Sequence, residues 1–139
     1  MTGEYQHTID IKGRIAVPSD LRGELGDKFH VSYGHGGCLV MHTTDAWSAL
    51  QDKLKAMPPV ESREFTRRFF SGAQCCDVDK QGRILLNANL RQHAGLRKDI
   101  MIIGANDRGE IWDLEAWRAF HAKSVDKMSM DDMMDVLGV

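Results

Sequence analysis

The sequence predicts an α+β fold, mainly β with flanking helices, in which two similar halves interleave into one body. The chain has 139 residues, of which 42% are hydrophobic and 27% charged, a balance typical of a soluble globular protein. Short apolar segments alternate with glycine-rich turns, which is typical of short strands. The same order of segments occurs twice, and a half of about 60 residues is marginally stable unless it shares its core.

The duplication is clearest around two Asp-x-x-Gly-Arg motifs. Residues 10–26 and 79–95 align at an offset of 69 positions, and seven of the seventeen aligned residues are identical. The identical pairs are Asp10/Asp79, Gly13/Gly82, Arg14/Arg83, Ile15/Ile84, Leu21/Leu90, Arg22/Arg91 and Gly26/Gly95. Farther along, Asp45-Ala46-Trp47 matches Glu115-Ala116-Trp117 at an offset of 70, which indicates one inserted residue. Matches in the same order in both halves indicate a duplicated structural unit.

Each half has the same predicted order of elements. A short strand enters the Asp-x-x-Gly-Arg turn, where Gly13 or Gly82 can adopt the positive φ of a tight turn. A strand, a short helix, a second strand, a glycine-rich turn and a third strand then follow. In the first half these segments span 15–17, 18–26, 29–33, 34–37 and 38–41, and in the second they span 84–86, 87–95, 100–103, 105–109 and 110–112.

Helices are predicted to close both halves. Thr44 and Asp113 can act as their N-caps, and Pro58-Pro59 ends the first of the two. A linking helix is expected near 61–70, and Ser129 can cap a last amphipathic helix. The chain is accordingly divided into a first repeat with its helix (1–58), a linking helix (59–74), a second repeat with its helix (75–122) and a helical or disordered tail (123–139).

Several motifs together resemble one family of DNA-binding proteins. Asp-x-x-Gly-Arg followed by Ile-x-h-Pro, where h is apolar, resembles the AbrB/MazE-type swapped-hairpin fold. Two copies in one chain, together with Gly3-Glu4-Tyr5 and the segments 67–73 and 110–113, resemble the MraZ family over about residues 1–122. This resemblance implies two tandem βαβ-type swapped-hairpin repeats, interleaved as a pseudo-dimeric split β-barrel. The second copy departs from the pattern at Asn87-Ala88, where a proline is usual.

The resemblance also implies a function and partners. Such proteins are bacterial transcriptional regulators that bind short direct repeats in the promoter of the division and cell-wall gene cluster, which includes their own gene. The implied partners are double-stranded DNA and further copies of the chain in a ring-shaped homo-oligomer. A cytoplasmic, nucleoid-associated protein without a membrane segment is expected.

Arg14 and Arg83 are the strongest candidates for reading DNA bases. A two-stranded β element fits the major groove, where a guanidinium can bond both O6 and N7 of guanine. Gln81 stands at the position of Lys12, so the two turns are not expected to contact DNA identically. The candidates for phosphate contacts, which fix register without reading sequence, are Lys12, Lys80, Arg22 and Arg91.

Asp10 and Asp79 are expected to support these turns. Each carboxylate can accept hydrogen bonds from turn amides or orient the arginine four residues on. The alternative interpretation is that each motif is only a hairpin turn closed by an internal ion pair. For Arg22 and Arg91 the alternative is a solvated helix face or a salt bridge with Asp20 or Glu24.

The overall charge constrains how the chain could bind DNA. With 18 basic and 20 acidic residues the net charge is −2, so any positive surface must be local. Because phosphate contacts carry much of the affinity for DNA, a single protomer is expected to bind weakly and an oligomer to gain through avidity.

Two other function classes are open to the same sequence. An antitoxin-like interaction module would keep the fold but bind a protein partner and regulate its own gene. An enzyme would need a nucleophile and a base that converge, and none can be named. Three cysteines, of which two are adjacent, give neither a disulfide framework nor a metal-ligand spacing. No catalytic residue, metal, cofactor or small-molecule substrate is predicted.

Overall fold

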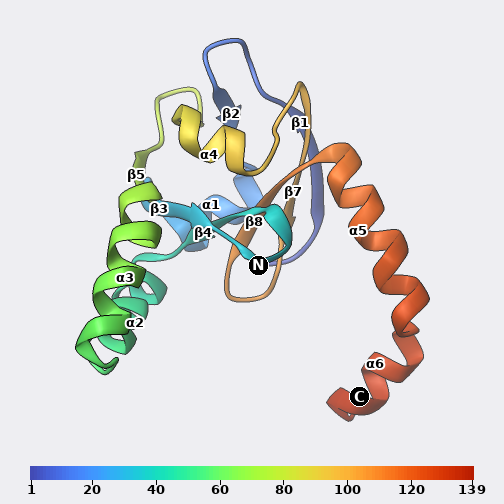
Figure 1. Ribbon diagram of the computed structural model, residues 1–139. Coiled ribbons are helices and arrows are strands. Elements are labelled where there is room, and N and C mark those ends of the chain that lie inside the picture. The colour runs from blue at the N-terminus through green and yellow to red at the C-terminus, as the bar shows by residue number, and fades with distance from the viewer.

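The computed structural model describes residues 1–139 as an α+β fold, which confirms the predicted class (Figure 1). The first half contains β1 (Glu4–Thr8), β2 (Arg14–Ala16), α1 (Ser19–Leu25), β3 (Lys28–Tyr33), β4 (Leu39–His42), α2 (Thr44–Lys55) and α3 (Pro59–Phe69). The second half contains β5 (Gln74–Asp77), β6 (Arg83–Leu85), α4 (Ala88–His93), β7 (Asp99–Gly104), β8 (Gly109–Asp113), α5 (Leu114–Lys127) and α6 (Met130–Leu137). Short 3₁₀ turns lie at His35–Gly37 and Phe70–Gly72.

The six-stranded antiparallel sheet mixes strands from both halves. Its order is β1-β7-β8-β4-β3-β5, so each half lends its first strand to the other half's edge. The order reads the same from either end when every strand is replaced by its counterpart in the other repeat. The two halves therefore interleave about an internal two-fold axis, as their small size predicts.

A separate pair of strands, which we call the central ribbon, joins the halves a second time. Strand β2 pairs antiparallel with β6, and Ile15 lies opposite Ile84. Just beyond the strands, the Val17 amide donates to the carbonyl oxygen of Gly82 and the Leu86 amide donates to that of Gly13, each at 2.9 Å. Each half therefore completes the turn of the other.

One core is shared by the ribbon, the large sheet and the two short helices. Ile15 and Ile84 from the ribbon and Leu21 and Leu90 from α1 and α4 are all buried in the same cluster. Burying a side chain of this size stabilises the fold by about 1.5–3 kcal/mol. Because counterparts from both repeats meet in one cluster, neither half buries a complete core by itself.

The structure does not confirm the predicted split β-barrel. The large sheet is open, with β1 and β5 as its two edges, and the central ribbon forms a sheet of its own. Strands β2 and β6 are three residues long and their ladder partners are each other, so they do not bridge the edges.

Most helix starts follow the predicted capping residues. The side chains of the predicted caps Asp113 and Ser129 accept hydrogen bonds from backbone amides three residues on, and Asn87 caps α4 in the same way. Helix α2 is capped by Thr43 and not by the predicted Thr44, and α1 has no side-chain cap because Pro18 stands at that position. A one-residue shift of this kind is beyond what local sequence determines.

The remaining helices lie at two opposite sides of the body. Helices α2 and α3 lie at one side, and α5 leads to α6 at the other, well away from the sheet (Figure 1). None of the helices combines the length and the apolar character needed to cross a membrane.

Glycine substitutions test the turn of the first repeat. Gly13 has φ of +88°, and a Cβ there would lie 3.0 Å from the Leu86 carbonyl oxygen. Gly13→Ala is therefore expected to lower the free energy of unfolding by about 1–3 kcal/mol. Gly23 lies in α1 with open space around it, so Gly23→Ala should raise it by about 0.5–1 kcal/mol. Urea denaturation checks both, and a Gly13→Ala protein as stable as wild type would contradict the assignment.

Candidate nucleic-acid interface

The register of the central ribbon places Arg14 and Arg83 on the same face. Arg14 pairs with Leu85, and Arg83 pairs with Ala16, while Ile15 and Ile84 form the pair between them. Paired residues and residues two apart along a strand share a face, so these four side chains lie opposite the buried isoleucines. The two guanidinium groups therefore start from one solvent-facing side of a two-stranded element, about 7 Å apart along the strand direction.

Both turns are built by the same set of hydrogen bonds. Asp10 Oδ1 accepts from the amides of Lys12 and Arg14 at 3.0 and 2.9 Å. In the second repeat, Asp79 Oδ1 accepts from the amides of Gln81 and Arg83, both at 2.9 Å. The bond from the Arg14 or Arg83 amide is the main reason that the pKa of each aspartate is lowered. Both carboxylates are therefore ionised at neutral pH.

The second oxygen of each aspartate holds the arginine side chain. Arg14 Nε lies 2.7 Å from Asp10 Oδ2, and Arg83 Nε lies 3.3 Å from Asp79 Oδ2. Neither arginine makes a hydrogen bond through its two terminal nitrogens, and about a third of each side chain is exposed. The internal ion pair of the alternative interpretation is thus present, but it leaves free the two nitrogens that a bidentate contact requires.

The two helix arginines lie over the opposite turns. A guanidinium nitrogen of Arg22 lies beside Gly82, and the guanidinium of Arg91 lies beside Gly13. The Nε atom of Arg91 is buried without a hydrogen-bond partner. The alternative of a salt bridge with Asp20 or Glu24 is not found, because Glu24 pairs with the amino terminus and Asp20 with the Tyr5 hydroxyl.

The side chains at the turn tips differ between the repeats. Lys12, Lys80 and Gln81 are exposed and make no ion pair or side-chain hydrogen bond within the chain. Ile11, the counterpart of Lys80, is 99% exposed. The structure therefore brings the predicted residues to two corners of the ribbon, and the chemistry of the corners is not the same.

Two cations that the sequence did not single out lie beside the first turn. Arg97 and Lys98 line a hollow of about 490 Å³ together with Arg91 and Asp10. The sequence does show a difference between the repeats here, because the loop after Gly95 carries two cations whereas the loop after Gly26 carries Asp27. Its relevance to DNA binding could be recognised only once the structure placed the loop of one repeat against the turn of the other.

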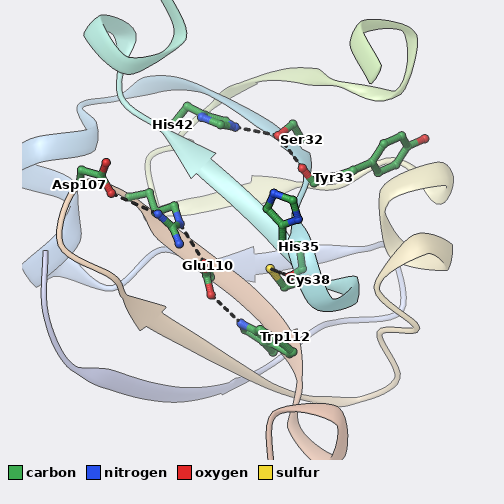
Figure 2. Close-up of polar contacts among 9 residues, drawn as sticks. Ser32, Tyr33, His35, Cys38, His42, Asp107, Glu110 and Trp112 are labelled. Carbon is green, nitrogen blue, oxygen red and sulfur yellow. Dashed lines mark hydrogen bonds and ion pairs between the residues drawn. The ribbon is translucent and has the colours of Figure 1, made fainter. Parts of the chain in front are cut away.

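A second polar cluster lies on the central strands, away from the ribbon (Figure 2). His42 Nε2 lies 2.7 Å from the Ser32 hydroxyl, and that hydroxyl donates to the Tyr33 carbonyl oxygen at 3.1 Å. Which of the two groups donates in the His42–Ser32 pair depends on the tautomer of the histidine. Ser32 is completely buried. The pair therefore lacks the access that a nucleophilic site needs.

Comparison with known proteins places this arrangement in a family. A family model described as "MraZ protein, putative antitoxin-like" matches the chain twice, at residues 1–68 and 69–136. The chain belongs to the MraZ family. The two matches also confirm the internal duplication predicted from the Asp-x-x-Gly-Arg motifs.

Curated relatives in the MraZ family match nearly the whole chain. The transcriptional regulator MraZ of Heliobacterium modesticaldum is 51% identical over 124 residues, covering 88% of this chain and 87% of the relative. The transcriptional regulator MraZ of Clostridium beijerinckii is 45% identical over 139 residues, covering 99% and 98%. That of Thermoanaerobacter pseudethanolicus is 46% identical over 122 residues, covering 86% and 85%.

The contact of the half-buried His42 with Ser32 predicts a specific pH dependence of stability. Burial, with smaller effects of His30 and Arg108, lowers the pKa of His42 to about 4. The unfolded chain protonates this ring near pH 6.5, so the stability conferred by the neutral ring is complete above about pH 6.5 and is lost as the pH falls toward 4. The loss is expected to be about 1–2 kcal/mol, allowing for solvent screening of this half-buried ring.

Urea denaturation at pH 7.0, 5.5 and 4.5 measures this loss. His42→Gln keeps a donor toward Ser32 but cannot be protonated, so its stability should change less over the same range. Asp10 and Asp79 are present in both proteins, so any loss of stability from protonating their carboxylates cancels in the comparison. Equal slopes for wild type and His42→Gln would contradict the role of His42.

Proposed function

We propose that the chain is a sequence-specific DNA-binding regulator of transcription that recognises short direct repeats in the promoter of the division and cell-wall gene cluster, including its own promoter. The observation that carries the proposal is the placing of Arg14 and Arg83 on one exposed face of the ribbon, with their terminal nitrogens free. The names of the relatives support the regulatory role. A protein with this role acts in the cytoplasm at the nucleoid and needs no catalytic residue or cofactor.

In this proposal the ribbon enters the major groove and the arginines read guanine. The major groove admits a two-stranded ribbon, and each bidentate arginine–guanine pair contributes about 1–3 kcal/mol of discrimination. Asp10 and Asp79 fix the direction of the guanidinium groups before DNA arrives. Lys12 and Lys80 at the tips would bind phosphates.

Gln81 and the two helix arginines are the remaining proposed DNA contacts. The amide of Gln81 can pair with N6 and N7 of adenine, a contact that Lys12 at the equivalent position cannot make. Arg22 and Arg91, which lie over the two turns, would bind phosphates.

We further propose that the DNA-bound species is a homo-oligomer. The net charge of −2 and the small number of cations at each corner give one protomer few phosphate contacts. Several protomers facing successive DNA repeats would gain through a raised effective concentration.

Two unlike surfaces on opposite sides of the molecule suit such an assembly. Helix α6 exposes an apolar stripe of Met130, Met133, Met134 and Leu137, and its charged residues are all aspartates. A groove of about 970 Å³ lies along α3, with Phe65 and Phe69 in its wall. In that wall α3 contributes three cations and two carboxylates, namely Arg63, Arg67 and Arg68, and Glu61 and Glu64.

A second copy of the chain is the proposed occupant of the groove. Helix α6 is about 12 Å long and α3 about 16 Å, so one can lie along the other. The two helices hold corresponding positions in the two repeats, each after the helix that closes its half. They lie at opposite sides of one chain (Figure 1), so a contact between neighbouring copies is head-to-tail, the type that closes into a ring.

Arginine variants test the proposed reading of DNA. Arg14→Ala and Arg83→Ala should each weaken binding to the duplex upstream of the gene, and Arg14→Lys, which keeps the charge but not the bidentate geometry, should lower the preference over an unrelated duplex by about 1–3 kcal/mol. Fluorescence anisotropy over a range of salt concentrations measures both quantities. Arg118→Ala, on exposed α5, is the matched control. Unchanged binding by the Arg14/Arg83 double alanine variant would refute the proposed reading.

Variants of α6 test the proposed assembly. Leu137→Glu places a charge on the apolar stripe and should weaken self-association about tenfold or more. A leucine that becomes buried in the contact between copies contributes about 1.5–3 kcal/mol to it. Val139→Glu lies beyond the helix and should leave assembly unchanged. Size-exclusion chromatography with light scattering gives the mass of each species. Identical masses for wild type and Leu137→Glu at all concentrations would exclude α6 from the contact.

A further inference from the structure

The two corners of the ribbon differ sharply in charge although their backbones match. The first corner consists of residues 8–14, Arg91 and residues 95–98, and the second of residues 77–83, Arg22 and residues 26–27. The first contains five cations and one carboxylate, and the second contains three of each. The repeat itself thus supplies an internal comparison, because one scaffold carries two different surfaces.

The extra charge of the first corner lines the 490 Å³ hollow described above. The Ile9 amide donates to the Lys98 carbonyl oxygen at 2.9 Å, which ties the cationic loop to the strand that enters the turn. From the other side, the guanidinium of Arg91 lies against Gly13, next to Arg14 in the chain. The hollow is therefore attached directly to the turn that presents Arg14.

The cations of this hollow are not neutralised equally. Arg97 is paired with Asp113 at 3.0 Å, and Asp113 also caps α5, so this arginine has a structural partner. Lys98 is exposed and makes no ion pair within the chain. Arg91 has a buried Nε without any acceptor. The exposed ammonium group of Lys98 is thus available to an anion, and the Arg91 guanidinium adds positive charge to the wall of the same hollow.

At the second corner the equivalent positions oppose an anion. Asp77 stands where the first corner has Thr8, and it pairs with Lys28 at 3.7 Å. Asp27 stands at the position of Lys98. Its carbonyl oxygen accepts a hydrogen bond from the Val78 amide, which fixes Asp27 beside the second turn. Asp27, which has no cationic partner within the chain, would repel a phosphate at the place where the first corner attracts one.

We propose that the hollow lined by Arg91 and Lys98 binds a backbone phosphate of duplex DNA, and that the first corner is consequently the stronger of the two DNA contacts. This inference rests on the proposed DNA-binding function. A scaffold with a two-fold axis would bind DNA in either of two opposite directions with equal affinity. Unequal phosphate binding at the corners makes the two ends of the protomer inequivalent. The direction on an asymmetric DNA repeat is then selected by base contacts that differ between the corners, such as Gln81 in place of Lys12.

A matched pair of lysine variants tests the proposal. Lys98→Gln should lower the slope of log affinity against log salt concentration by about 0.9 and weaken binding at 0.1 M salt about five- to tenfold, because one phosphate contact is lost. Lys123→Gln removes an exposed, unpaired lysine from α5, which belongs to neither corner, and should change neither quantity. The measurements are made in chloride buffer without inorganic phosphate. Equal slopes for Lys98→Gln, Lys123→Gln and wild type would overturn the proposal.

Uncharged DNA positions locate the contact. A set of duplexes in which single phosphates are replaced one at a time by methylphosphonates should contain one position, on one side of the repeat only, that weakens wild type but not Lys98→Gln. The absence of any position of this kind would overturn the proposal, and two symmetric positions would show that the protomer binds the repeat in both directions and would overturn the single direction.

The experiment separates this inference from the proposed function. A wild-type protein that binds the upstream duplex and an unrelated duplex equally would refute sequence-specific regulation. The Lys98→Gln slope on either duplex would still decide the phosphate contact, because such a contact does not depend on base sequence. If added inorganic phosphate binds but the slope with DNA is unchanged, the hollow is a site for free phosphate and the proposal is wrong.

Discussion

The exchange of backbone hydrogen bonds between the two halves is the constraint on which the rest of the structure depends. The Val17 amide reaches Gly82 and the Leu86 amide reaches Gly13, so neither turn is complete without the other repeat. Between these bonds, Ile15 and Ile84 face the core, and the alternation of a strand then forces their neighbours outward. The position of Arg14 and Arg83 on one exposed face is therefore a consequence of packing, and it needs no further device.

The aspartate of each turn has two structural roles that ordinarily compete. An exposed ion pair contributes little to stability, so the contact between Asp10 and Arg14 is better understood as positioning than as stabilisation. The carboxylate is already bound by two turn amides, which holds it in place before it meets the guanidinium. Because only Nε of the arginine contacts the carboxylate, the side chain is oriented while its two terminal nitrogens stay free for DNA. The same motif thus serves as a turn closed by an ion pair and as a candidate for base recognition.

Local patterns predicted the elements, while contacts between distant residues were beyond them. The Asp-x-x-Gly-Arg motifs predicted both turns, and Asp113 and Ser129 were identified as caps because a cap depends on neighbours three residues away. The interleaving followed from the size of each half. The open sheet did not follow, and neither did the place of Lys98 beside the first turn, because its loop and that turn are more than 80 residues apart. Such a neighbour is defined only by the swapped topology.

A duplicated scaffold can differ only where the two-fold axis does not require agreement. Positions that supply backbone bonds or fill the shared core keep the same chemistry, as Gly13 and Gly82 do, because each contacts the other repeat. Positions that face solvent are free of that requirement, and one such position holds Ile11 in the first repeat and Lys80 in the second. A symmetric backbone carries no direction, whereas a direct DNA repeat has one. Directional recognition must therefore come from the outer side chains, which is where the two halves have diverged.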